Sequence, residues 1–339
     1  KQRSTIKLNV NNPLKIGDKL SITKTFNAGE KFDFSQFDYE VPLGQSGLKA
    51  FASASRLEFE IGKELKTNPV SLGNADTYEV GVKYPIQRTN NQSVFLKTSI
   101  EKKEIYNETT GVLTNDKTLE NAKIGLDFEG KNVFQDSSLT GVSVSGIFGD
   151  LDLSKVNSDY LNDQRDTGPK THGDFNKVVL DFYHIHKFTD KINFKYYGSL
   201  QHASKNLDSS EKFSLGGVSG IRAYPSGEAS GDEGHKLSFE IQYDLSKPDA
   251  DFDLIGTLFY DYGKIRQYKD SSNITLTTPN EYSLSGWGVS FDLIANERVK
   301  LNLGWAQAIG DNDGQSSSGN NSDGRGGSSR TWFQVIFRF

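Results

Sequence analysis

T-Y-E-V-G-V-K-Y, residues 77–84, is the stretch that decides the fold class of this sequence. Tyr78, Val80, Val82 and Tyr84 share one face of an extended chain, and the residues that alternate with them are charged or glycine. This two-residue period is typical of a β-strand with one apolar face. It recurs along the whole chain, and no 3.6-residue period of comparable length competes with it. The sequence therefore predicts an all-β protein.

The alternation predicts about fifteen strands. They are expected at residues 4–11, 19–26, 31–41, 48–61, 75–85, 93–106, 120–131, 138–151, 175–188, 192–204, 235–245, 253–265, 283–294, 299–309 and 331–339. Several are longer than the usual five or six residues and approach the length of a tilted membrane span. No run approaches the roughly 18 apolar residues of a spanning helix, which excludes an α-helical membrane protein.

The connections between these strands alternate in length. Long polar loops are expected at 62–74, 107–119, 152–174, 205–234, 266–282 and 310–330, and short turns at 42–47, 86–92, 132–137, 189–191, 245–252 and 295–298. A meander with tight turns on one side and long loops on the other is the pattern of a transmembrane, antiparallel, up-and-down β-barrel. A soluble sandwich with Greek-key links has no reason to keep it.

The predicted strand count is odd, whereas bacterial single-chain barrels have an even number. We therefore expect one further strand before Lys1, which gives sixteen strands in the intact protein. Residues 1–339 are interpreted as one barrel domain. The last strand ends in Phe339 and resembles the C-terminal signature by which outer-membrane barrels are recognised for assembly, although an ordinary edge strand would also fit.

One loop departs from ordinary loop composition. Residues 213–234 read F-S-L-G-G-V-S-G-I-R-A-Y-P-S-G-E-A-S-G-D-E-G. The glycines at 216, 217 and 220 permit positive φ and close backbone approach. We expect the loop, at about 205–234, to fold inward and carry Arg222 into the lumen. A buried guanidinium needs a carboxylate partner, and the strand alternation places Glu240 and Asp261 on the lumenal face.

These segments resemble the Omp85 superfamily. G-I-R-A-Y is similar to its sixth-loop core, and the following P-S-G-E and G-D resemble the two-partner secretion (TpsB) branch, which exports haemolysins, filamentous haemagglutinins and contact-dependent inhibition toxins. F-Y-D-Y-G matches the family's wall motif Phe-x-Asp-x-Gly, and N-N-P-L-K-I-G-D at 11–18 resembles the turn after the second strand. The matching residues are Gly220, Ile221, Arg222, Ala223, Tyr224, Pro225, Gly227 and Glu228 in the loop, and Phe259, Asp261 and Gly263 on the wall. Ala223 departs from the usual glycine, so a positive φ is less expected there.

The resemblance implies that Arg222 pairs with Asp261 and that Glu240 is a second acceptor. It implies POTRA domains and a plug helix upstream of this sequence. It also implies a monomer in the outer membrane of a Gram-negative bacterium, in contact with the bilayer and lipopolysaccharide and inserted by the barrel-assembly machinery. The implied activity is export of an unfolded, β-helix-forming TpsA-type exoprotein without nucleotide. No G-x-x-x-x-G-K-[ST] motif occurs in the chain.

Two alternatives stay open: a passive sixteen-stranded porin with a constricting loop, and a barrel-assembly insertase of the same superfamily. We expect no enzyme, cofactor or metal. The absence of cysteine removes thiol and cysteine-zinc chemistry, and His184 and His186 share a strand face without a third ligand. A net charge of -5 does not indicate nucleic acid. An adhesin, a haemolysin and a contact-dependent inhibition toxin are all compatible cargoes.

Overall fold

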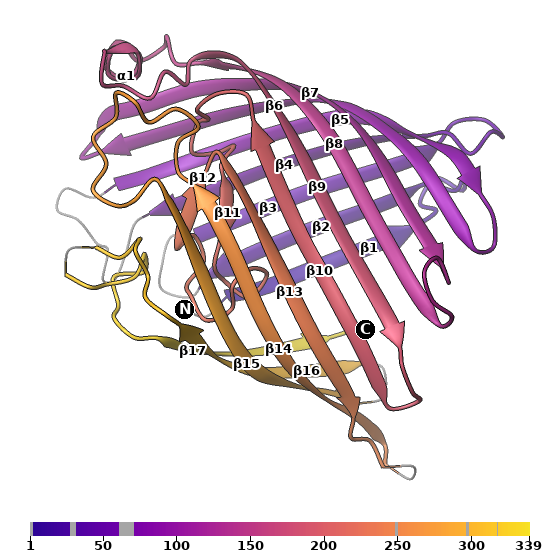
Figure 1. Ribbon diagram of the computed structural model, residues 1–339. Coiled ribbons are helices and arrows are strands. Elements are labelled where there is room, and N and C mark those ends of the chain that lie inside the picture. The colour runs from indigo at the N-terminus through magenta and orange to yellow at the C-terminus, as the bar shows by residue number, and fades with distance from the viewer. Residues whose placement is uncertain (1–2, 28–31, 61–70, 248–249, 296–297, 317) are drawn as a thin grey trace.

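The computed structural model describes residues 3–27, 32–60, 71–247, 250–295, 298–316 and 318–339. One antiparallel sheet of fifteen strands dominates it and curls around a central space (Figure 1). The strands are β1 (Arg3–Asn11), β2 (Lys19–Asn27), β3 (Phe32–Pro42), β4 (Lys49–Glu60), β5 (Ser71–Arg88), β6 (Gln92–Thr109), β7 (Val112–Lys131), β8 (Ser138–Asp152), β9 (Gly173–Lys187), β10 (Ile192–Ala203), β13 (Glu233–Asp244), β14 (Phe252–Arg266), β15 (Glu281–Ala295), β16 (Val299–Ile309) and β17 (Ser329–Phe337). Each strand pairs with the next along the sheet, and β10 pairs with β13.

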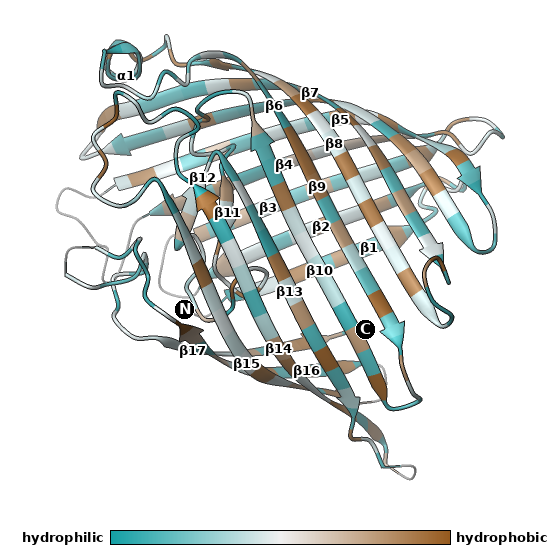
Figure 2. Cartoon of the chain, in the orientation of Figure 1, coloured by the Kyte–Doolittle hydropathy of each residue, from teal (hydrophilic) through white to brown (hydrophobic). Residues whose placement is uncertain are grey.

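Hydrophobic and hydrophilic residues alternate along most strands of the sheet (Figure 2). Tyr78, Val80, Val82 and Tyr84 are all exposed, at 38–51%. The polar residues between them face the enclosed side. Apolar side chains are therefore displayed outward and polar ones enclosed, which is the polarity of a barrel in a bilayer and the reverse of a soluble sandwich.

The fifteen predicted strands are present, and most of their ends lie within a few residues of the prediction. The predicted long loop 107–119 is wrong. There β6 and β7 continue as a paired hairpin, closed by Thr110 and Gly111 with φ of 56° and 72°. Residues 107–119 are mostly polar on both faces, so the apolar alternation that identifies a strand is lost although the backbone pairing continues.

The loops contain small elements that the sequence pattern does not predict. Helix α1 (Asn157–Gln164) lies in the loop before β9, and β11 (Phe213–Leu215) pairs with β12 (Ala229–Gly231) inside the loop before β13. These elements are too short for a periodicity signal. Residues 31, 61–70, 248–249, 296–297 and 317, which the prediction places at strand ends, turns and loops, lie outside the described residues.

The last long loop, 310–330, has the composition of a disordered glycine-serine segment, but its described residues adopt a hydrogen-bonded conformation. The Asn321 side chain donates to the carbonyl of Gly327 at 3.0 Å, and Arg330 pairs with Asp323 at 3.0 Å. Buried side-chain and backbone contacts, rather than composition, therefore determine the order of this loop.

Buried apolar side chains form two clusters between the loops and the inner wall. The tip cluster consists of Phe213, Leu215, Ile221, Ala223, Tyr224, Ala229, Phe259, Ile265, Tyr282, Leu284 and Ala306. The root cluster consists of Leu119, Leu151, Leu153, Phe175, Ala203 and Leu207. Both include residues of the loop 205–234, so this loop is the main packing element of the interior. No helix in the described ranges is long and apolar enough to cross a membrane.

The turn between β1 and β2, residues 12–18, is fixed by one carboxylate. Asp18 is 1% exposed and accepts hydrogen bonds from the backbone N–H of Leu14 at 3.2 Å and from the hydroxyl of Tyr39 at 2.8 Å. Gly17 has a φ of 84° and donates to the side chain of Asn12 at 2.6 Å. The polar residues of N-N-P-L-K-I-G-D thus specify a single turn conformation.

Candidate functional site

The loop between β10 and β13 folds back into the space enclosed by the sheet (Figure 1). The β11–β12 hairpin leads into and out of the loop tip. Gly216 and Gly217 have φ of 87° and 82°, which glycine alone adopts without strain. A Cβ on Gly220 would lie 2.6 Å from the carbonyl oxygen of Gly216. These glycines make the tight reversal that brings Arg222 against the wall.

Arg222 at the loop tip and Asp261 on β14 form a bidentate pair. The guanidinium Nη2 lies 2.7 Å from Oδ1 and Nε lies 2.9 Å from Oδ2 of the carboxylate. The backbone N–H of Arg222 also donates to Oδ2 at 3.0 Å. Asp261 is fully buried and Arg222 is 8% exposed. Bidentate pairing fixes both the position and the orientation of the arginine.

Glu240 on β13 is a second acceptor for the same guanidinium. Its Oε1 accepts from Nη1 of Arg222 at 2.7 Å and from the hydroxyl of Tyr197 at 3.0 Å. Ser238, two residues earlier on the same face, donates to Asp261 and lies 3.3 Å from Nη2 of Arg222. We call Arg222, Asp261, Glu240 and Ser238 the tip anchor. Sequence reasoning did not assign a contact to Ser238, although its lumenal direction follows from the alternation of β13.

The three wall-motif residues of β14 point inward, as the two-residue alternation along this strand predicts. The guanidinium carbon of Arg222 lies 3.5 Å from the centroid of the Phe259 ring, a cation-π contact in a buried setting. A Cβ on Gly263 would lie 2.6 Å from the side chain of Leu215. Phe259 thus supports the arginine, Asp261 binds it, and Gly263 leaves room for β11.

Comparison with known proteins identifies the family of this barrel. The family model of the haemolysin secretion/activation proteins ShlB/FhaC/HecB matches residues 1–293. The chain belongs to this family. It is an outer-membrane β-barrel of the two-partner secretion (TpsB) type in the Omp85 superfamily, whose members are transporters rather than enzymes.

One curated relative and two solved structures show what this chain is similar to in sequence and in fold. The heme/hemopexin transporter protein HuxB of Haemophilus influenzae strain 86-028NP is 27% identical over 304 residues, which is 89% of this chain and 53% of HuxB. Among solved structures, CdiB from Escherichia coli has a TM-score of 0.75 at 16% identity and covers 99% of this chain and 59% of its own. BamA from Haemophilus ducreyi has a TM-score of 0.63 at 10% identity over 98% of this chain and 67% of its own. The chain spans about half the length of HuxB.

The partners of Arg222 in this TpsB barrel stabilise its charged form. Burial alone would lower the pKa of Arg222, but the hydrogen bonds and charge of Asp261, with Tyr197 and Glu240, raise it above the usual value. The guanidinium therefore stays charged. Removing one partner of such a buried pair leaves an uncompensated charge, which typically costs roughly 3–5 kcal/mol.

Ala223, which stands where the TpsB family usually has glycine, has no positive φ. It is 1% exposed. On the neighbouring wall Gly286 of β15 has no side chain, and a Cβ there would lie 2.6 Å from the Cβ of Ala223. The space left by Gly286 therefore accommodates the extra methyl group. Sequence reasoning missed Gly286, although a glycine inside a strand often marks a close approach.

Residues 225–228 of the TpsB loop extension contact the last long loop. Gly227 has a φ of 75°, and Glu228 is 6% exposed. The Glu228 carboxylate accepts from the backbone N–H of Ser322 at 2.7 Å and from the side-chain amide of Asn312. Burial, with the charges of Glu228 and Asp311, raises the pKa of Tyr224 to about 12. The extension thus holds loop 310–330 against the inward loop.

The remaining sites raised by the sequence lie apart from the loop. Phe339 is fully exposed beyond the end of β17. The Nδ1 atom of His184 lies 2.8 Å from the hydroxyl of Thr140, and its ring stacks on Tyr196. Within the described ranges, no three His, Asp or Glu side chains are grouped so that they could hold a metal ion.

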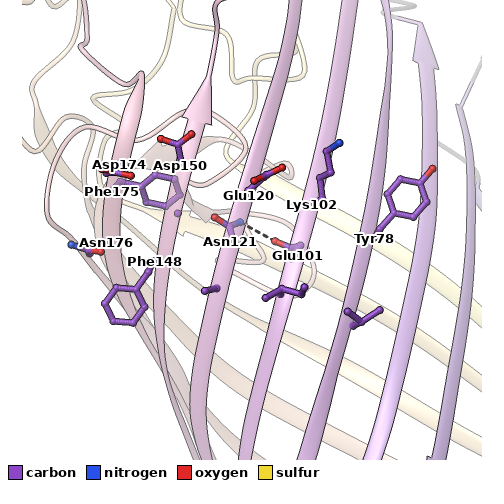
Figure 3. Close-up of a pocket in the computed structure, with 14 residues that line it drawn as sticks. Tyr78, Glu101, Lys102, Glu120, Asn121, Phe148, Asp150, Asp174, Phe175 and Asn176 are labelled. Atoms are coloured by element: carbon purple, nitrogen blue, oxygen red, sulfur yellow. Dashed lines mark hydrogen bonds between the residues drawn. The ribbon is translucent and has the colours of Figure 1, made fainter.

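A pocket of about 830 Å³ lies across β5 to β9 and contains no residue of the inward loop (Figure 3). Its lining includes exposed residues of the outward face, such as Tyr78, Phe148 and Glu120. It also includes Glu101 and Asn121, which belong to the inner wall and are joined by a hydrogen bond of 2.9 Å. The pocket does not belong to the tip anchor.

Proposed function

We propose that this chain is the translocation barrel of a two-partner secretion transporter, which exports an unfolded, β-helix-forming exoprotein from the periplasm to the cell surface without nucleotide. One observation carries the proposal. The Arg222 and Asp261 pair holds a glycine-rich loop inside the lumen of a barrel from the ShlB/FhaC/HecB family. The roles proposed for the loop and wall residues rest on this geometry.

The tip anchor argues against a passive porin. Burying a guanidinium and two carboxylates carries a large desolvation cost, which only well-formed hydrogen bonds offset. A diffusion pore needs a narrow opening, and an exposed polar loop provides that without a buried charge cluster. A barrel that must hold one loop in one position does have a use for such a cluster.

The loop extension favours the secretion branch over a barrel-assembly insertase. Glu228 lies in the segment 225–232 that resembles TpsB proteins, and it makes buried contacts to loop 310–330. The extension therefore has a structural partner in this chain. An insertase that shares only the loop core would not need it.

The proposal extends to the parts and partners of the whole protein. We propose POTRA domains, a plug helix and a sixteenth strand upstream of residues 1–339. The outward face contacts lipid and lipopolysaccharide, Phe339 serves recognition by the barrel-assembly machinery, and the transporter acts as a monomer. HuxB is a heme/hemopexin transporter by name. For this chain we propose a TpsA-type cargo of the adhesin, haemolysin or contact-dependent inhibition class.

A secretion assay tests the proposal against the porin alternative. A candidate TpsA-type exoprotein is expressed with and without the full-length transporter, and both exoprotein in the medium and uptake of small sugars are measured. We expect exoprotein in the medium only when the transporter is present. Faster sugar uptake with no secreted exoprotein would support the porin instead.

A further inference from the structure

The root of the inward loop, residues 205–212, has an attachment of its own, distinct from the tip anchor. Leu207 is 2% exposed and packs in the root cluster with Leu119, Leu151 and Phe175. The tip packs in the other cluster. The loop therefore enters two apolar clusters at two separate places on the wall.

A buried carboxylate marks the root. Glu211 is 3% exposed and lies between two lysines of the inner wall, Lys103 on β6 at 2.6 Å and Lys177 on β9 at 2.8 Å. Lys177 also donates to the backbone carbonyl of Glu211 at 2.8 Å. Three positions earlier in the loop, Asp208 pairs with Lys117 on β7 at 2.6 Å. We call Asp208, Glu211 and these three lysines the root anchor.

The wall side of the root anchor is itself held in place. Lys103 lies 3.4 Å from Glu101, and Glu101 also pairs with Lys123 at 2.6 Å. Asn121 donates to Glu101 at 2.9 Å, the contact drawn as a dashed line in Figure 3. Charges of opposite sign therefore alternate along the inner face of β6 and β7 up to Glu211, and Glu101 is a second partner of Lys103 on the wall.

Neighbouring loops close over the same point. The side chain of Asn206 donates to the carbonyls of Pro169 at 2.8 Å and Asp270 at 2.9 Å, which belong to the loops on either side. Lys205 donates to the carbonyl of His172 at 2.8 Å. The root of the inward loop is thus hydrogen-bonded to the long loop before β9 and to the long loop after β14.

The two anchors use different strands. The tip anchor lies on β13 and β14, and the root anchor lies on β6, β7 and β9. Strand β10 separates the two sets along the sheet. Among the described residues, no side-chain hydrogen bond or ion pair joins Glu211 to the tip anchor. Each anchor has its own charges and its own apolar cluster.

We propose that Glu211 is a positioning residue which, with Asp208, fastens the root of the inward loop to the β6–β9 wall. The loop is then held at two points, and the root can be released while Arg222 stays paired with Asp261. Ion pairs suit this role because they specify one arrangement without necessarily adding stability. The inference about loop position is independent of the cargo, and only its consequence for export rests on the proposed function.

Spin labelling of the full-length transporter tests this. The sequence contains no cysteine, so one cysteine introduced at exposed Ser209 reports the root and one at exposed Ser219 reports the tip. We expect Glu211→Gln to increase the mobility of the label at 209 several-fold and to leave the label at 219 unchanged. Arg222→Ala should do the reverse. Channel conductance in planar bilayers should rise for Glu211→Gln and stay near wild type for Glu211→Asp.

Two further variants keep the test interpretable. Lys117→Gln removes the wall partner of Asp208 and should mobilise the label at 209 even if Glu211→Gln fails to assemble. Asp190→Asn removes a 96% exposed carboxylate from a short turn and should change neither label. If Glu211→Gln and Lys117→Gln leave the root label immobile, or mobilise both labels equally, the second anchor is contradicted. Because no exoprotein is needed, a failure of the secretion assay does not affect this result.

Discussion

Arg222 and Asp261 are 39 positions apart in the sequence, and the guanidinium donates two hydrogen bonds of 2.7 and 2.9 Å to the fully buried carboxylate. The contact joins the tip of a long loop to the middle of a strand. It converts a flexible connection into a fixed element of the lumen. We propose that export depends on that contact.

Arg222→Ala should abolish most secretion without preventing barrel assembly. Loss of one partner of a buried pair costs roughly 3–5 kcal/mol, and about 1.4 kcal/mol is a tenfold change in an equilibrium. We therefore expect secreted exoprotein to fall by at least about tenfold. Exoprotein in the medium and surface-accessible barrel are the two measurements. Arg56→Ala, which removes an arginine that is 54% exposed, should have no such effect.

The Ala223 and Gly286 contact predicts a compensating pair of substitutions. Gly286→Ala would place two Cβ atoms 2.6 Å apart, and overpacking of this kind typically costs about 1–3 kcal/mol. We expect a more protease-sensitive loop and reduced secretion. Adding Ala223→Gly should restore part of the loss, since the new Cβ would still lie 3.0 Å from the carbonyl of Gln307. Gly146→Ala, with nothing nearer than 3.7 Å, is the matched control; equal loss in single and double variants would contradict the contact.

Glu228 should control the order of loop 310–330. Glu228→Ala removes a buried acceptor from the Ser322 N–H and the Asn312 amide, and an unpaired buried donor typically costs about 1–3 kcal/mol. We expect faster trypsin cleavage within this loop when intact cells are treated with the protease, measured by mass spectrometry of the released peptides. Glu104→Gln, which changes an exposed carboxylate, serves as the control. Unchanged cleavage in Glu228→Ala would show that the loop is held by other contacts.

The root anchor should resist mild acid. Burial tends to raise the pKa of Asp208 and Glu211, but the charges of Lys117 on one and of Lys103 and Lys177 on the other lower both below their usual values. Carboxylates with lowered pKa keep their stabilising contribution above the usual pKa and lose it as pH falls through the lowered one. A label at position 209 should therefore stay immobile from about pH 7 to about pH 5 and become mobile only below about pH 4. Release near pH 6 would contradict these pairs.

The sequence alone predicts the strands well where one face is apolar. Strand β16 begins and ends where predicted, since Leu301, Leu303 and Trp305 alternate with small or polar residues. The same signal fails at 107–119, where pairing continues but both faces are mostly polar. Local periodicity identifies a strand by its apolar face, so it does not detect a paired segment whose two faces are both mostly polar.

The candidate site was likewise predictable from the sequence only in part. The lumenal direction of Glu240 and Asp261 follows from alternation, and their pairing with Arg222 follows from the family resemblance. The partners of Glu211 do not follow from either. Lys103 lies 108 positions away, on a strand that meets the loop only because the sheet curls. Contacts of that kind require the three-dimensional arrangement, as does the match between Ala223 and Gly286.

A charge-reversal cycle tests whether export depends on the contact between Arg222 and Asp261. Secretion of the exoprotein is measured for wild type, Arg222→Asp, Asp261→Arg and the double variant, with barrel insertion checked in each. We predict that each single change loses most secretion and that the double variant recovers part of it, because opposite charges again face each other. If the double variant secretes no more exoprotein than the combined effects of the two single changes predict, the two residues do not act through their contact.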